Sequence, residues 1–73
     1  MTVNELYHAC ENIDREAYVF IYNSMKAYQR KEKPVFRCEY YFLPNGWAIQ
    51  SVARFSIQND GDDVYILLSN YGE

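Results

Sequence analysis

The sequence predicts one α+β domain over residues 1–73, in which an N-terminal helix packs on an antiparallel sheet of about four strands. Three observations support this class: a helix-capping motif near the start, short apolar segments typical of strands, and turn residues between the later segments. The last three strands follow one another closely, so we expect them to form a meander. The helix would then cover one face of the sheet and leave the other face open.

The helix is expected to begin at Val3, because Thr2 and Glu5 match the S/T-x-x-E capping box, in which each side chain satisfies a backbone amide of the other residue. Apolar residues follow at the spacing of one buried helix face: Val3, Leu6, Tyr7, Cys10 and Ile13. The polar residues between them point towards water: Asn4, Glu5, His8 and Glu11. The pattern predicts a helix that ends near Asn12.

The next segment, residues 17–22, is an uninterrupted apolar run rich in β-branched and aromatic residues. Such a run indicates a central strand with a neighbour on each side. Residues 23–33 are polar and basic. Ser24 can cap a short helix through Met25 and Tyr28, or the stretch forms a long hairpin loop, and the sequence leaves these alternatives open.

The remaining chain predicts three strands joined by two tight turns. In residues 35–43, apolar and aromatic side chains occupy the even positions, and the charged Arg37 and Glu39 occupy odd ones. This alternation is typical of a half-buried strand. The Asn-Gly pair at 45–46, preceded by a proline, favours a type I′ hairpin turn. Residues 47–58 continue with a period of two, and the Asp-Gly pair at 60–61 turns the chain into the last strand at 64–69.

Aromatic residues make up 18% of the chain, as eight tyrosines, four phenylalanines and one tryptophan. A domain this small cannot bury so many rings, so some of them lie on its surface. Exposed rings of this kind are typical of surfaces that bind a partner. We expect the surplus rings on the open face of the sheet, with four candidates: Tyr18, Tyr22, Tyr41 and Tyr65.

Ten acidic residues against seven basic ones give a net charge of −3. This balance argues against a general affinity for nucleic acid or for an anionic membrane, because both require a positive excess. The cations concentrate in one stretch, at Lys26, Arg30, Lys31, Lys33 and Arg37. The segment up to residue 16 and the turn at 60–63 are acidic, so we expect a bipolar molecule.

No constellation typical of catalysis, of a metal site or of a cofactor site stands out in the sequence. His8 is the single histidine, and Cys10, two residues away, points to another side of the predicted helix. The acidic turn at residues 60–63 lacks the calcium-loop pattern and its distal glutamate. We therefore expect a non-enzymatic protein without a metal or a cofactor.

Cys10 and Cys38 are too few and too far apart for a zinc signature or a secreted disulfide scaffold. We interpret both as reduced core thiols, with one bridge between them as the alternative. The start of the chain carries polar residues where a signal peptide requires an apolar region. No apolar run approaches the length of about 20 residues that spans a membrane. These observations favour a cytoplasmic protein.

The stretch 26–41 combines cations with rings, and the residues that we expect to bind a partner lie mostly within it: Tyr28, Arg30, Lys31, Phe36, Arg37, Tyr41 and Tyr65. Rings beside arginines are typical of interface hot spots, so a protein is the first expected partner. A solvated, purely solubilising loop is the structural alternative.

The second functional hypothesis is a binder of nucleic acid or of a small ligand, such as a dimeric nucleotide sponge. In it, Tyr28, Phe36 and Tyr40 stack on a base. Arg30, Lys31 and Arg37 then hold the phosphate groups. A homodimer also remains open, because self-association compensates for a small core.

Residues 2–6, which read T-V-N-E-L, lead through the connector Asn12-Ile13-Asp14 into the apolar strand at 17–22. Together with the closing segments at 47–52 and 64–69, this arrangement resembles small, mostly uncharacterised bacteriophage and mobile-element proteins. The resemblance spans about half of the chain, and the basic, aromatic middle at 25–41 departs from it. It implies a phage-encoded accessory protein in the host cytosol that occupies a host defence protein, as anti-CRISPR inhibitors do.

Overall fold

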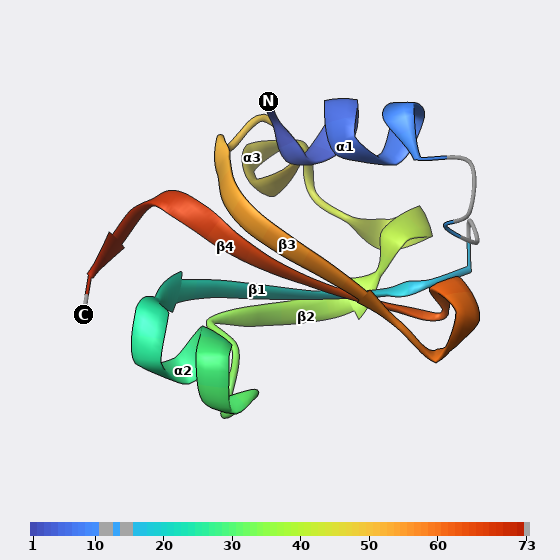
Figure 1. Cartoon of the computed structure of the whole chain (residues 1–73). Helices are drawn as coiled ribbons and strands as arrows, with labels where there is room; N and C mark the ends of the chain where they lie inside the picture. The colour runs from blue at the N-terminus through green and yellow to red at the C-terminus, as the bar shows by residue number, and fades with distance from the viewer. Residues whose placement is uncertain (11–12, 14–15, 73) are drawn as a thin grey trace.

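The computed structural model describes residues 1–10, 13 and 16–72, and Figure 1 traces the chain through helices and a twisted sheet. The elements follow in this order: α1 (Val3–Ala9), β1 (Tyr18–Ser24), α2 (Met25–Arg30), β2 (Phe36–Glu39), the 3₁₀ turn η1 (Tyr40–Phe42), α3 (Asn45–Ala48), β3 (Val52–Gln58), the 3₁₀ turn η2 (Asn59–Gly61) and β4 (Asp63–Gly72). The structure confirms the predicted α+β class and a four-stranded sheet.

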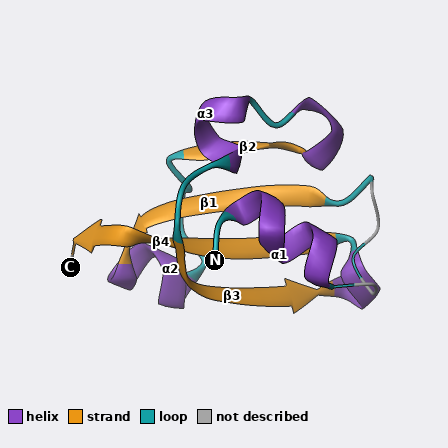
Figure 2. Cartoon of the chain, turned by 90° about the horizontal axis from the view of Figure 1, so that it is seen from above, coloured by secondary structure: helices purple, strands orange, loops and turns teal. Residues whose placement is uncertain are grey.

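The sheet is mixed, with the strand order β2-β1-β4-β3 (Figure 2). β1 runs antiparallel to β2 and parallel to β4, whereas β3 and β4 form the antiparallel hairpin that the sequence predicts. The expected all-antiparallel meander is therefore wrong, because β2 and β3 lie at opposite edges. The apolar strand β1 takes a central place, as predicted, and its second neighbour is the apolar β4.

The expected hairpin turn at residues 45–46 is wrong as well, because these residues begin the short helix α3. The carbonyl oxygen of Pro44 accepts hydrogen bonds from the amides of Trp47 at 3.0 Å and Ala48 at 3.1 Å. The flanking strands are shorter than predicted: β2 ends at Glu39, and β3 begins at Val52. In between, Tyr40, Leu43 and Trp47 pack against the main core, whereas Tyr41 and Phe42 stay exposed, so tertiary packing of the former overrides the local turn signal.

The second predicted turn is confirmed, because η2 joins β3 to β4 through the Asp-Gly pair. Asn59, Asp60 and Gly61 all have positive φ angles, of 53°, 57° and 95°. Asparagine, aspartate and glycine tolerate this left-handed backbone better than other residues. β4 then extends beyond the predicted 64–69, from Asp63 to Gly72.

The main core lies between α1 and one face of the sheet. The capping box at the start of α1 is formed: the Thr2 amide donates to Glu5 Oε1 at 2.9 Å, and the Glu5 amide donates to Thr2 Oγ1 at 3.2 Å. The helix ends at Ala9, before the predicted end at Asn12; Glu11, Asn12 and Asp14 lie outside the described residues. The predicted apolar stripe packs into this core, whose fully buried members are Val3, Leu6, Ala17, Val19, Ile21, Val64, Ile66 and Leu68.

A second, smaller core lies under α2 on the other face of the sheet. It consists of Tyr22, Tyr28 and Leu67, with partly buried neighbours. Residues 25–30 form a helix, one of the two alternatives left open, because the Ser24 hydroxyl accepts from the Ala27 amide at 3.4 Å. Tyr22 is only 1% exposed and donates its hydroxyl to the Glu32 carbonyl at 2.8 Å, so the expectation of a surface ring there is wrong.

Both cysteines are free thiols, as interpreted from the sequence, and both are half-buried. Cys10 packs against the main core. Burial, and then the neighbouring negative charge of Glu39, raise the pKa of the Cys38 thiol, which favours its neutral form.

Candidate functional site

The face of the sheet that carries α2 is only partly covered. Because side chains alternate along a strand, Tyr18, Phe20 and Tyr22 of β1 share this face, while Val19 and Ile21 belong to the main core. β4 adds Tyr65 and Leu67 to the same face. α2 packs over Tyr22 and Leu67, and the rings farther along the two strands are only partly covered: Phe20 and Tyr65 pack against this small core, and Tyr18 is exposed. We call Tyr18, Phe20 and Tyr65, with the cations that surround them, the open aromatic face.

The three rings of the open aromatic face form a continuous row across the two central strands. Phe20 and Tyr65 are paired in register, and their rings stack with centroids 4.6 Å apart and planes 13° apart. The Tyr18 ring follows at 6.5 Å from that of Phe20. Tyr18 is 44% exposed, whereas Phe20 and Tyr65 are half-buried by their mutual contact. The row therefore presents ring edges and tyrosine hydroxyls to solvent.

Three cations surround the row of rings. Lys31, held in a left-handed conformation at the C-terminal cap of α2, places its Nζ 4.6 Å from the centroid of the Tyr65 ring. Arg37 of β2 lies over the Tyr18 ring, with its Cζ 6.0 Å from the centroid. Arg54 of β3 is the strand partner of Leu67. Burial raises the pKa of Tyr28, and the positive charge of Arg54 partly offsets this increase. Cation–π contacts of this kind hold the long side chains against the rings.

Acidic residues lie at the opposite end of the same face. Glu39 and Asp63 pair with Tyr18 from its two sides, in β2 and β4 respectively. Asp60 and Asp62 follow in the turn next to them. The end next to α2 is basic, so the molecule is bipolar, as the sequence predicts.

The structure brings together three of the predicted partner-binding residues, namely Lys31, Arg37 and Tyr65, on the open aromatic face. Arg30 is exposed on the neighbouring helix α2. Tyr28 lies beneath Lys31 and is only 8% exposed, because it fills the small core under α2. Tyr28 therefore supports Lys31 by packing beneath it and is too buried to contact a partner itself.

The other two predicted residues, Phe36 and Tyr41, lie elsewhere. Phe36 points to the α1 side, where its ring stacks on that of Trp47 at 5.2 Å. Tyr41 belongs to η1 and is 71% exposed on the border of a hollow beside α1. The strand expected there ends at Glu39, so Tyr41 does not join the sheet face.

Sequence reasoning did not single out Phe20 and Arg54 for the site. The available signal was the alternation of rings at positions 18, 20 and 22, but the residues between them are apolar too. A strand that is apolar on both sides does not reveal which side remains open. The position of Arg54 beside Leu67 results from the pairing of β3 with β4, which the sequence pattern does not specify at the level of single residues.

Among residues 1–10, 13 and 16–72, no group of three or more His, Cys, Asp and Glu side chains is arranged to hold a metal ion. His8 is exposed on α1, on the polar face predicted for it. The described part of the chain contains no helix of the length and apolar character needed to cross a membrane.

Comparison of the chain with protein-family models, with curated proteins and with solved structures gave no significant match.

Proposed function

We propose that the protein is a non-enzymatic interaction module that binds a protein partner through the open aromatic face. The observation that carries this proposal is the row of Tyr18, Phe20 and Tyr65 at the centre of the sheet, enclosed by Lys31 and Arg37. Tyrosine and arginine are enriched among the residues that dominate binding energy at protein interfaces. The rigid central strands also present these rings at little entropic cost.

The orientation of the rings favours a protein partner over nucleic acid. A base needs a free ring face on which to stack. Phe20 and Tyr65 cover one another's faces at 4.6 Å, and the Lys31 ammonium occupies the Tyr65 ring as well. Tyr18, the most exposed of the three rings, has the Arg37 guanidinium over it, so the surface mixes ring area with cationic groups and suits the mixed side chains of a protein.

The charges around the rings define the chemistry of this partner. Its contact surface should carry an apolar centre that meets Tyr18 and Phe20. Carboxylates should face Arg37 and Lys31, and basic groups should face Glu39, because complementary charges set the orientation and the association rate of a complex.

A host defence protein is the first candidate for this partner, with the host cytosol as the place of action. The support is the resemblance of the T-V-N-E-L opening and the closing segments to phage and mobile-element proteins. Such a module would act by occupying a surface that the host protein needs, which requires no catalytic group.

Nucleic acid or a nucleotide is the second candidate, favoured by the positions of Lys31 and Arg37 beside the rings and of Arg54 beside Leu67 on the same face. Phosphate contacts release counterions, so such binding falls steeply as salt rises. A contact dominated by apolar groups depends far less on salt. The ionic strength at which the partner is released therefore separates the two candidates.

Photo-crosslinking tests the proposed face directly. The variant Tyr18→benzoylphenylalanine carries a photoreactive group on the open aromatic face, and Tyr71→benzoylphenylalanine carries the same group at the far end of β4, where Tyr71 is 42% exposed. In bacterial lysate we expect a discrete protein adduct from position 18 at low and at high salt, and none from position 71. Equal labelling from both positions would contradict the proposal, and nuclease-sensitive adducts that disappear at high salt would favour nucleic acid.

A further inference from the structure

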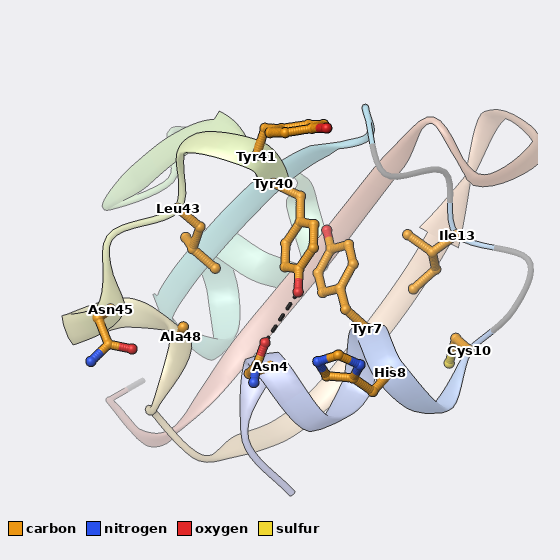
Figure 3. A pocket seen from close by; sticks show the side chains of 10 residues that line it. All are labelled: Asn4, Tyr7, His8, Cys10, Ile13, Tyr40, Tyr41, Leu43, Asn45 and Ala48. Carbon is orange, nitrogen blue, oxygen red and sulfur yellow. Dashed lines mark hydrogen bonds between the residues drawn. The ribbon is translucent and has the colours of Figure 1, made fainter.

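A hollow of about 670 Å³ lies on the other side of the molecule, between α1 and the segment that carries η1 and α3 (Figure 3). Binding sites for small molecules measure about 300–1,000 Å³. None of Tyr18, Phe20 and Tyr65 lines this hollow, which meets a second hollow beside Tyr18 only at Tyr41. The protein contact proposed above therefore does not use its lining.

A pair of stacked tyrosines forms the centre of this hollow. The rings of Tyr7 and Tyr40 lie 3.8 Å apart with planes 5° apart, although they come from different elements. The Tyr40 hydroxyl donates to Asn4 Oδ1 at 3.1 Å, which fixes the orientation of its ring. Figure 3 shows Leu43 and Ala48 on the side of Tyr40 that faces away from Tyr7. This arrangement leaves the outer face of the Tyr40 ring directed into the hollow.

The lining is polar and aromatic but carries no Asp, Glu, Lys or Arg among its ten described residues. This is notable in a chain in which 23% of the residues are charged. The hydrogen-bonding groups around the hollow are the amides of Asn4 and Asn45, the His8 imidazole and the tyrosine hydroxyls. Against these ten residues a charged molecule would lose water without gaining an opposite charge, so the described part of the lining favours an uncharged one.

Tyr7 closes the other face of the Tyr40 ring. The two rings stack at 3.8 Å, so only the outer face of Tyr40 is left for a bound molecule. The Tyr7 hydroxyl is buried on the closed side and has no hydrogen-bond partner among the described residues, so it does not contact a molecule on the outer face.

We propose that this hollow is a binding site for a small, uncharged, planar molecule that stacks on the outer face of Tyr40. A heterocycle of the nucleobase type has the required shape, and its edge carries donors and acceptors that match the amides of Asn4 and Asn45. Aromatic stacking supplies the affinity, and the neutral polar rim supplies the orientation. The site is separate from the protein contact proposed above, so each can fail without the other.

An NMR titration tests the proposal, with adenine as the neutral probe and adenosine monophosphate as its charged counterpart. With the ¹⁵N-labelled protein, we expect adenine to shift the signals of Asn4, Tyr40 and Ala48 in a saturable manner. The monophosphate should bind at least about tenfold more weakly, because its phosphate finds no cation in the hollow. The variant Ala48→Phe should remove the shifts by filling the space, whereas Tyr65→Leu, on the open aromatic face, should keep them.

Four results would overturn the proposal: no saturable shifts with adenine, shifts that map to the open aromatic face, equal or tighter binding of the monophosphate, or unchanged binding by Ala48→Phe. Since Ala48→Phe can also disturb α3, the milder variant Tyr40→Leu is measured beside it. It removes the stacking surface, and we expect it to weaken adenine binding by at least about tenfold as well. Retained binding in this variant would equally contradict the proposed stack.

Discussion

Tyr7 combines a well-packed ring with an unsatisfied hydroxyl. Its ring stacks on Tyr40, but its buried hydroxyl has no hydrogen-bond partner in the described part of the chain. We expect Tyr7→Phe to raise the free energy of unfolding by about 1 kcal/mol, because it removes an unpaired polar group and keeps the ring. Urea denaturation measures this change.

The matched control is Tyr40→Phe, which loses the hydrogen bond to Asn4. It should lower the free energy of unfolding by about 0.5–1 kcal/mol. A clear loss of stability in Tyr7→Phe would show that the hydroxyl is satisfied in solution.

The buried tyrosines also give the stability a defined dependence on alkaline pH. Burial raises the pKa values of Tyr7, Tyr22 and Tyr28 above the value of 10.0 for a free tyrosine. The unfolded chain then loses these protons at a lower pH than the folded protein does. Their contribution is therefore fully present below pH 10 and is lost as the pH rises through the raised pKa values.

Chemical denaturation at a series of pH values checks this sign. We expect a constant denaturation midpoint up to about pH 8, a small fall from about pH 9 because the pKa of the Cys38 thiol is also raised, and a steeper fall above about pH 10. Ultraviolet absorbance follows the ionisation of the tyrosines in the same samples. Ionisation of all eight tyrosines in one early step, with the fold intact, would contradict the burial described above.

At the scale of elements, two glycines distinguish the observed helix α3 from the predicted hairpin. Gly46 has no positive φ, and a Cβ atom added there would meet nothing within 4 Å. We expect Gly46→Ala to leave stability unchanged or to raise it by about 0.5–1 kcal/mol, because alanine favours a helix. A type I′ turn would require a positive φ at this residue and would be destabilised by the same change.

Gly61→Ala is the control for this experiment, because Gly61 has a φ of 95° in η2. It should lower the free energy of unfolding by about 1 kcal/mol or more. Thermal denaturation of both variants provides the comparison. If Gly46→Ala were as damaging as Gly61→Ala, α3 would not be the structure of this segment in solution.

The elements that the sequence predicted correctly depend on local chemistry. The Thr2 and Glu5 capping box sets the start of α1, and the Ser24 hydroxyl can cap α2 whichever tertiary contacts follow. The Asp-Gly turn needs left-handed residues that only a few amino acids tolerate. The Asn-Gly pair at 45–46 carries an equally strong local signal, but the stack of Phe36 on Trp47 draws this segment onto the core.

The strand order and the candidate site depend on pairing between distant segments, which local patterns do not specify. β1 and β4 are both apolar on two faces, so neither shows from its sequence which neighbour it takes or which face α2 will cover. Tyr22 and Tyr65 are equally good surface candidates by sequence. The structure buries the former under α2 and leaves the latter partly open.

At the scale of the whole molecule, rings and charges are distributed over two separate surfaces. The open aromatic face lies between a basic end at α2 and an acidic end at η2, and the neutral hollow lies beside α1. A bipolar face orients a partner before contact, and salt should slow association more than it weakens the apolar contact. The homodimer left open because of the small core stays a prediction; a second copy on the same face would compete with the partner.

The central claim is that partner binding uses the open aromatic face, and two exposed tyrosines test it most directly. Tyr18 lies on this face, whereas Tyr71 is similarly exposed but lies at the far end of β4. The measurement is the calorimetric affinity of the cross-linked partner, once purified, for Tyr18→Ala and Tyr71→Ala. We expect Tyr18→Ala to weaken binding at least about tenfold without lowering the melting temperature, and Tyr71→Ala to bind as the unaltered protein does. Full affinity in Tyr18→Ala, with loss of binding in Tyr71→Ala, would contradict the account.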